Sequence, residues 1–210
     1  MFPYMRVTDS RGTITVSGEH TSYGAPDEAL LTLGVMTEGP DLQKAQQENN
    51  EKIKNIVGTL QANGVSKSDI QTANYQIIPR YSFEDGKQIF NGYEVVNILR
   101  IHLRSIERAG KIIDDAVKAG ANRVEGIQFL SSHSTALYQH ALEQAYRDAL
   151  AKATVLARQS GQELVPDPLS IKEGQSVEFP SPMMLAVQES AILPGEISVK
   201  ASLIVTFTTH

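Results

Sequence analysis

The 210-residue sequence predicts an α+β protein, in which a mostly antiparallel sheet with a split βαβ, ferredoxin-like core carries about three helices packed on one face. Segments of period two alternate with segments of helical period, and their order is strand, helix, strand, strand, helix, strand. Two helix-to-strand turns also resemble each other, at residues 61–70 (QANGVSKSDI) and 120–127 (GANRVEGI). This likeness indicates an internal repeat, although Gly and Asn are common in any such turn.

Two strands and a helix open the fold. Residues 13–17 alternate, and from Glu28 to Met36 the odd positions are apolar, which is typical of a strand with one buried face. A helix is expected from about Asp41 to Asn63, with Gly64 as its left-handed terminator. The buried face of this helix is expected to comprise Leu42, Ala45, Asn49, Ile53, Ile56 and Leu60.

A β-hairpin follows the first helix. Its strands are expected at about 71–81 and 93–103, and Asp85-Gly86 is a strong signal for a tight hairpin turn. Pro79 cannot donate a hydrogen bond to a neighbouring strand, so this strand end is expected at a sheet edge or a bulge.

The remaining elements are expected in this order: a helix between Ser105 and Gly120, a strand at 124–131, the longest helix at 134–160, and strands at 169–172 and 199–207. We expect the long helix and the last strands to extend the same sheet and to cover the same face. Alanines line one face of the long helix, which allows close packing within the chain or a contact between subunits.

The domain organisation is expected to be simple. Residues 1–12 read as a flexible N-terminal arm, and residues 13–210 as a single domain with an apolar loop insertion at 174–195. Apolar residues are unusual in a loop, so this cluster is expected to be buried on its own domain, against another subunit, or against a membrane or small ligand. The candidate residues for an oligomer or interaction surface are Met183, Met184, Leu185 and Val187.

Composition and charge exclude several classes of protein. The chain has 19 Lys and Arg against 24 Asp and Glu, a formal charge of −5, which argues against a nucleic-acid-binding face. It has no Cys, and no apolar run approaches the roughly 18 residues of a transmembrane segment. The N-terminus lacks the apolar region of a signal peptide, so the expected location is cytoplasmic, or periplasmic or extracellular if a leader has been removed.

No motif indicates catalysis, a cofactor or a metal. Phosphate-binding glycine motifs and serine nucleophile motifs are missing from the sequence. His133 and His140 lie seven residues apart on the long helix, about 10.5 Å along its axis, which is too far to chelate one ion. We therefore expect no catalytic, cofactor-binding or metal-binding residues. A pocket converging on Tyr93, Arg100 or His102 would instead favour a ligand-binding protein.

A series of short motifs resembles the SIMPL-domain family. They run in order over nearly the whole chain: Pro26-Asp-Glu-Ala29, Ala45 with Asn49, Val65-Ser-Lys-Ser-Asp-Ile-Gln-Thr72, Ile78-Pro-Arg-Tyr81, Gly92-Tyr93, Ala119-Gly-Ala-Asn122 and Ala149-Leu-Ala-Lys-Ala153. The family includes periplasmic immunogenic proteins and an oxidative-stress defence protein, and one periplasmic member forms a ring-like, channel-shaped homo-oligomer. The resemblance implies a non-enzymatic protein without a cofactor, linked to bacterial stress or envelope physiology.

Three functions follow as hypotheses. The first is self-assembly into a homo-oligomer, which rests on the resemblance and on the apolar loop. The second is a small-ligand-binding protein or an enzyme with a pocket between sheet and helices. The third is a regulatory module that binds another protein by strand addition or through the loop.

Overall fold

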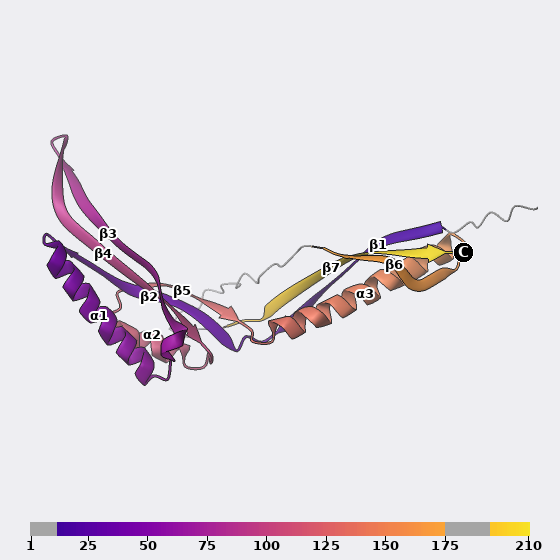
Figure 1. The fold of residues 1–210 in the computed structure, drawn as a ribbon, viewed down its shortest axis with the longest axis horizontal. Coiled ribbons are helices and arrows are strands. Elements are labelled where there is room, and N and C mark those ends of the chain that lie inside the picture. The colour runs from indigo at the N-terminus through magenta and orange to yellow at the C-terminus, as the bar shows by residue number, and fades with distance from the viewer. Residues whose placement is uncertain (1–11, 175–193) are drawn as a thin grey trace, which may run out of the picture. The chain divides into compact units, whose positions relative to one another are not determined.

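The computed structural model describes residues 12–174 and 194–210, which divide into two compact units (Figure 1). Residues 25–132 are continuous in sequence, and we call them the ferredoxin-like unit. Residues 12–24, 133–174 and 196–210 make up the other unit, which we call the long-helix unit. Both units combine helices with antiparallel strands, so the predicted α+β class is confirmed.

The ferredoxin-like unit has the predicted split βαβ order. Its elements are β2 (Glu28–Gly39), α1 (Leu42–Ala62), a 3-10 turn (Lys67–Asp69), β3 (Ile70–Glu84), β4 (Lys87–Leu103), α2 (Ala109–Lys118) and β5 (Arg123–Leu130). The strands are ordered β3-β4-β2-β5, and every neighbouring pair is antiparallel. The connection through α1 therefore skips one position in the sheet, because β4 lies between β2 and β3. The connection through α2 does the same, because β2 lies between β4 and β5.

Apolar side chains alternate along the two central strands, β2 and β4, and those on one face form the core of this unit. Leu31 and Leu33 of β2 and Ile101 of β4 are fully buried under Ile56 and Leu60 of α1. Burying one such side chain stabilises the fold by roughly 1.5–3 kcal/mol. α2 completes the core with Ala109, Ile112 and Ala116.

The ends of α1 are those that the sequence predicts. The Asp41 side chain accepts hydrogen bonds from the backbone N–H groups of Gln43 and Lys44, at 2.9 and 3.2 Å. This cap satisfies donors that have no partner within the helix. Gly64 has a φ of 90°, the left-handed conformation expected of a residue that ends a helix.

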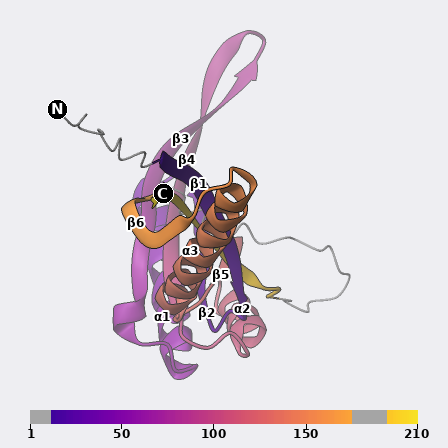
Figure 2. The same cartoon turned by 90° about the vertical axis from the view of Figure 1, so that its right-hand side faces the viewer.

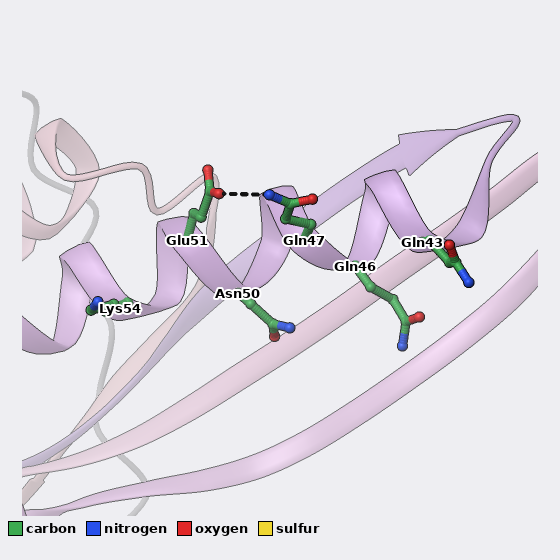
Figure 3. Close-up of a pocket in the computed structure, with 6 residues that line it drawn as sticks. All are labelled: Gln43, Gln46, Gln47, Asn50, Glu51 and Lys54. Carbon is green, nitrogen blue, oxygen red and sulfur yellow. Dashed lines mark hydrogen bonds between the residues drawn. The ribbon is translucent and has the colours of Figure 1, made fainter.

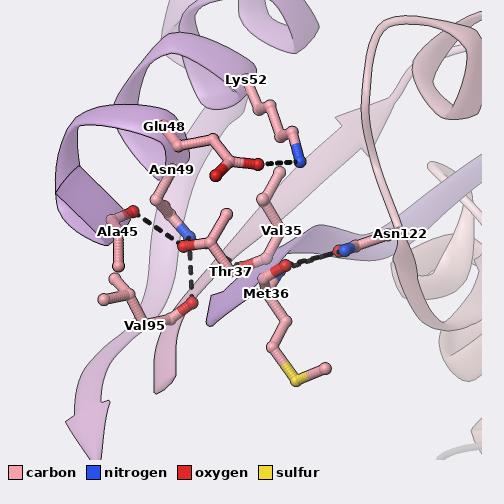
Figure 4. A network of polar contacts seen from close by, with 9 residues as sticks. All are labelled: Val35, Met36, Thr37, Ala45, Glu48, Asn49, Lys52, Val95 and Asn122. Atoms are coloured by element: carbon pink, nitrogen blue, oxygen red, sulfur yellow. Dashed lines mark hydrogen bonds and ion pairs between the residues drawn. The ribbon is translucent and has the colours of Figure 1, made fainter. Parts of the chain in front are cut away.

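One buried amide joins α1 to both central strands (Figure 4). Asn49 is completely buried, and its Nδ2 donates to the carbonyl oxygens of Val35 in β2 (3.2 Å) and Val95 in β4 (3.0 Å). The Thr37 hydroxyl donates to the Ala45 carbonyl at 2.8 Å. The predicted apolar stripe of α1 thus contains a polar residue because it carries hydrogen bonds across the helix–sheet interface.

The long-helix unit is a second, smaller sheet under one helix. It comprises β1 (Gly12–Gly24), α3 (Ser134–Gln159), β6 (Leu164–Glu173) and β7 (Ile197–Thr209), with the antiparallel order β1-β7-β6. α3 runs along these strands (Figure 2). The expectation that the long helix and the last strands extend the first sheet is therefore wrong, because β1 and β7 pair with each other instead.

Alanines let α3 approach its sheet closely. The stripe Ala141, Ala145, Ala149, Ala153 and Ala157 is buried, and most of it packs on Val205 and Phe207 of β7. Close approach also requires Gly18 in β1, where an added Cβ would lie 2.0 Å from the Ala145 carbonyl oxygen. Of the two expectations for this stripe, packing within the chain is confirmed.

Replacing Asn49 tests the amide contact. We expect Asn49→Ala to lower the free energy of unfolding by about 2–3 kcal/mol, because it removes bonds to two buried carbonyls and leaves a cavity. The neighbouring Asn50 is exposed, so Asn50→Ala is the matched control and should change stability by less than about 0.5 kcal/mol. Urea denaturation followed by circular dichroism measures both variants. Equal midpoints would show that the amide contributes nothing.

Replacing Gly18 tests the close approach of α3. Gly18→Ala should destabilise the protein by about 1–3 kcal/mol or more, since the new methyl group would collide with the helix backbone. Gly58→Ala is the control, because this helical glycine has no atom within 4 Å of an added Cβ and should gain up to about 1 kcal/mol. Thermal unfolding of both variants checks the opposite signs. A stable Gly18→Ala protein would contradict the described packing.

Candidate interaction surface

The hairpin formed by β3 and β4 outruns the rest of its sheet. β2 pairs with β4 only as far as Gly39, opposite Tyr93, whereas β3 and β4 continue pairing to Glu84 and Lys87. Residues 80–92 therefore form a two-stranded ribbon without a third strand, which we call the β3–β4 ribbon (Figure 1). Its turn residues Asp85 and Gly86 both have positive φ, 49° and 75°, as the predicted tight turn requires.

The ribbon and the adjoining part of β3 expose large apolar side chains. The exposed set is Tyr75, Ile77, Ile78, Tyr81, Phe83, Ile89 and Phe90, and the most exposed is Phe83, at 75%. Phe90 contacts the rings of Tyr81 and Tyr93 edge-on, with centroids 5.6 and 5.1 Å apart. Monomeric proteins rarely expose contiguous apolar surface of this kind.

One face of the ribbon is aromatic, and the other combines Ile89 with the polar residues Ser82, Glu84 and Lys87. The rings of Tyr81, Phe90 and Tyr93 are in contact and so share one face. Ile89 precedes Phe90 and therefore points to the opposite face, because consecutive side chains of a strand alternate. A single covering layer would bury only one of these faces.

Ion pairs of Arg80 and a close contact between the backbones at Gly92 and Gly39 hold the base of the ribbon against the sheet. The Arg80 guanidinium donates to the carboxylate of Glu38 in β2 and to that of Glu94 in β4, the latter at 3.4 Å. Gly92 has a φ of 113°, and a Cβ there would lie 2.5 Å from the Gly39 carbonyl oxygen. These contacts fix the direction in which the ribbon leaves the sheet.

Beside β3, α1 presents a polar face. Gln43, Gln46, Gln47, Asn50, Glu51 and Lys54 line a shallow depression of about 470 Å³ (Figure 3). Figure 3 shows Gln46 and Asn50 pointing from the helix toward the strands drawn below it. Gln46 Nε2 donates to the Tyr75 hydroxyl at 3.1 Å, so this face adjoins the exposed side of β3.

The residues proposed for a ligand pocket are not brought together. Tyr93 lies at the base of the ribbon, Arg100 is exposed, and His102 is nine residues from Tyr93, about 30 Å along an extended strand. His102 Nε2 lies 3.0 Å from a Glu28 carboxylate oxygen. These residues share a strand but no single cavity.

A small cavity of about 250 Å³ does lie beside His102, lined also by Arg104, Arg108 and Asp69. Arg104 donates two hydrogen bonds to Asp69, at 3.0 and 2.9 Å. These hydrogen bonds and the positive charge of Arg104 hold the pKa of the Asp69 carboxyl below its usual value. The charges of Arg104 and Asp69 therefore already neutralise each other.

The histidines of the long-helix unit are engaged in contacts with each other and with the sheet. His140 Nδ1 lies 3.0 Å from the hydroxyl of Ser22, and the rings of His140 and His20 meet edge-on with centroids 5.9 Å apart. Over residues 12–174 and 194–210, no three His, Asp or Glu side chains gather closely enough to hold a metal ion.

The candidate loop cannot be placed. Met183, Met184, Leu185 and Val187 lie outside the described residues, so their role as an interaction surface stays a prediction. The β3–β4 ribbon is the surface that the sequence reasoning missed. Its signal was present as apolar residues at both odd and even positions around Asp85-Gly86, from Ile77 to Phe90.

Among the helices of the described part of the chain, none has both the length and the apolar character to cross a membrane. Their buried apolar residues lie on the faces that pack on the two sheets.

Comparison with known proteins identifies relatives over most of the chain. It is 29% identical to the uncharacterized protein YggE of Escherichia coli K12 over 178 residues, 85% of this chain and 72% of YggE. It is 28% identical to the 26 kDa periplasmic immunogenic protein of Brucella melitensis over 219 aligned residues, covering 96% of this chain and 86% of that protein. YggE of Edwardsiella ictaluri is 27% identical over 154 residues, 73% of this chain and 64% of that protein.

These relatives give no support to a cytoplasmic location, since one of them is named as periplasmic. The family model described as SIMPL, a protein of unknown function (DUF541), matches residues 14–207. This match spans both units and confirms the resemblance carried by the short motifs. The chain belongs to the SIMPL (DUF541) family.

Proposed function

We propose that this chain is a non-enzymatic, periplasmic protein that self-assembles into a homo-oligomer, in bacterial envelope or stress physiology, and that the β3–β4 ribbon is a principal contact. The observation that carries the proposal is the exposure of four large apolar side chains on the ribbon: Tyr81, Phe83, Ile89 and Phe90. The periplasmic part rests on the name of the Brucella relative, and the self-assembly of the chain also follows the resemblance to its family.

The exposed apolar area is large enough to matter. Taking about 200 Å² for each whole side chain, the exposed fractions of Tyr81, Phe83, Ile89 and Phe90 amount to roughly 420 Å² per copy. A standard stable interface buries about 800 Å² on each partner. At about 25 cal/mol per Å², 420 Å² corresponds to ~10 kcal/mol before the cost of association, which is about 4–15 kcal/mol. The ribbon thus supplies about half of an interface and leaves room for a second contact.

Native mass tests the proposal. Light scattering at micromolar concentration should give a particle several times heavier than the 23.0 kDa chain. The double variant Phe83→Ser and Phe90→Ser should lower this mass at least two-fold, because it removes exposed aromatic area without disturbing the core. A strict monomer of the unaltered chain would overturn the proposal.

A matched control separates the ribbon from apolar surface in general. Val155 and Leu156 of α3 are 59% and 49% exposed, so Val155→Ser with Leu156→Ser removes comparable surface elsewhere. We expect this control variant to keep the mass of the unaltered protein. An equal loss of mass in both double variants would show that the ribbon has no special part in assembly.

The apolar loop gives an independent prediction. Replacing Met183, Met184 and Leu185 together by Ser should also reduce the native mass if the loop is buried between subunits. The same light-scattering measurement checks this triple variant. An unchanged mass would remove the loop from the interface and leave the ribbon as its apolar part.

A further inference from the structure

β3 is an edge strand with an unprotected outer side. Its residues 71–81 are all exposed, and no strand in the described part of the chain pairs with it on the side away from β4. From Ile70 to Ile78 it contains neither a charged residue nor a proline, two of the devices that keep edge strands from pairing with other chains, although its register with β4 shifts between Thr72 and Asn74. In β3 such residues come only after this stretch, at Pro79, Arg80 and Glu84. The other edge strands carry them as well: Arg123 and Glu125 in β5, Pro166 and Pro168 in β6, and Glu19 in β1.

The helix wall next to this edge is self-complementary. Gln43, Gln46, Gln47 and Asn50 each carry a donor and an acceptor in one amide, so this face can hydrogen-bond to a copy of itself. Glu51 and Lys54 add one charge of each sign to the same face. Beside this wall, Tyr75 and Ile77 remain 44% and 38% exposed on the side of β3 that faces α1, since Gln46 donates a hydrogen bond to Tyr75 and Ile77 lies two residues further along the strand.

From this edge and wall we infer that two copies of the chain pair β3 with β3, antiparallel and about a twofold axis near Tyr75 and Gln76. The inference rests on the proposed self-assembly and adds a second contact to that of the ribbon. The axis stands perpendicular to the sheet, so the two four-stranded sheets become one continuous sheet. Both copies of α1 then lie on the same face of that sheet.

The pairing satisfies several groups at once. The outward N–H and C=O groups of the edge find partners in the second copy, as in other cases of strand addition. Tyr75 and Ile77 of both copies form the floor of a trough between the two α1 walls, which buries part of their exposed apolar surface. The two amide-rich walls face each other across that floor.

A twofold pairing also leaves the ribbon free for a different contact. β3 pairs through its edge, whereas the ribbon side chains project from the two faces of the hairpin. An assembly built from both contacts grows beyond a dimer, because each copy offers two separate surfaces. If the edge of β3 pairs with a second copy while the ribbon makes another contact, residues 70–78 need no charge at the edge and can be apolar on the faces.

Spin-label distances test the pairing directly. The chain has no Cys, so single-cysteine variants Thr72→Cys, Asn74→Cys, Gln76→Cys and Ile78→Cys each carry one label on an exposed side chain. The antiparallel pairing predicts a distance minimum near residues 74–76 and an increase of about 7 Å for each residue away from it, twice the rise of a strand. Equal distances at all four positions would indicate parallel pairing and overturn the inference.

A charge variant tests the same contact by mass. Gln76→Lys places two like charges near the axis and should lower the native mass at least two-fold. Gln128→Lys is the matched control, because Gln128 is exposed on β5, the other edge of the same sheet, and its change should leave the mass unaltered. Circular dichroism confirms that both variants are folded.

The outcomes separate the two proposals. A monomeric unaltered chain overturns both self-assembly and strand pairing. A heavy particle without a distance minimum, whose mass Gln76→Lys leaves unchanged, overturns strand pairing alone. A distance minimum near residues 74–76, together with the loss of mass in Gln76→Lys, supports both.

Discussion

The antiparallel pairing of β2 with β4 places every other element of the ferredoxin-like unit. β5 is positioned by β2, β3 is positioned by β4, and α1 crosses the seam between them. Asn49 links the helix to both strands, because its amide donates a hydrogen bond to a carbonyl on each of them. A buried donor is costly unless it is hydrogen-bonded, so α1 is held in the register that pairs Asn49 Nδ2 with these carbonyls.

The same pairing creates the exposed ribbon. β2 ends at Gly39, and the chain turns at once into α1, whose cap is Asp41. The helix therefore runs back along the sheet, while β3 and β4 continue in the opposite direction to Asp85 and Gly86. The exposure of Phe83 and Phe90 is thus a consequence of strand length and helix direction, not of a local defect in packing.

Local features of the fold were predictable, and partnerships between distant strands were not. The period of β2, the cap at Asp41, the terminator Gly64 and the Asp85-Gly86 turn are encoded by neighbouring residues. The pairing of β1 with β7 is not, because periodicity does not say which strand pairs with which. β1 also extends to Gly24, beyond the predicted end at Ser17, since Gly18, Glu19 and His20 interrupt its alternation.

The sequence reasoning missed the β3–β4 ribbon because apolar residues are generally expected to be buried. Residues such as Ile77, Ile78, Ile89 and Phe90 are commonly buried in proteins, and only the length of β2 shows that nothing in the described structure covers them. The apolar cluster at residues 183–187 was predicted to be an interaction surface, because apolar residues are unexpected in a loop between prolines. Its place in the protein remains a prediction, because it falls outside the described residues.

The pairing of β1 with β7 has a consequence for how the chain folds during synthesis. Thr15 and Thr206 hydrogen-bond to each other across this pair although they are 191 residues apart in sequence. The ferredoxin-like unit between them is continuous and contains all of its own strands, so it can fold as soon as it has been made. β1 cannot form its hydrogen bonds with β7 until β7 has been synthesised. Pairings between segments so far apart in sequence form slowly, so we expect the long-helix unit to fold after the ferredoxin-like unit.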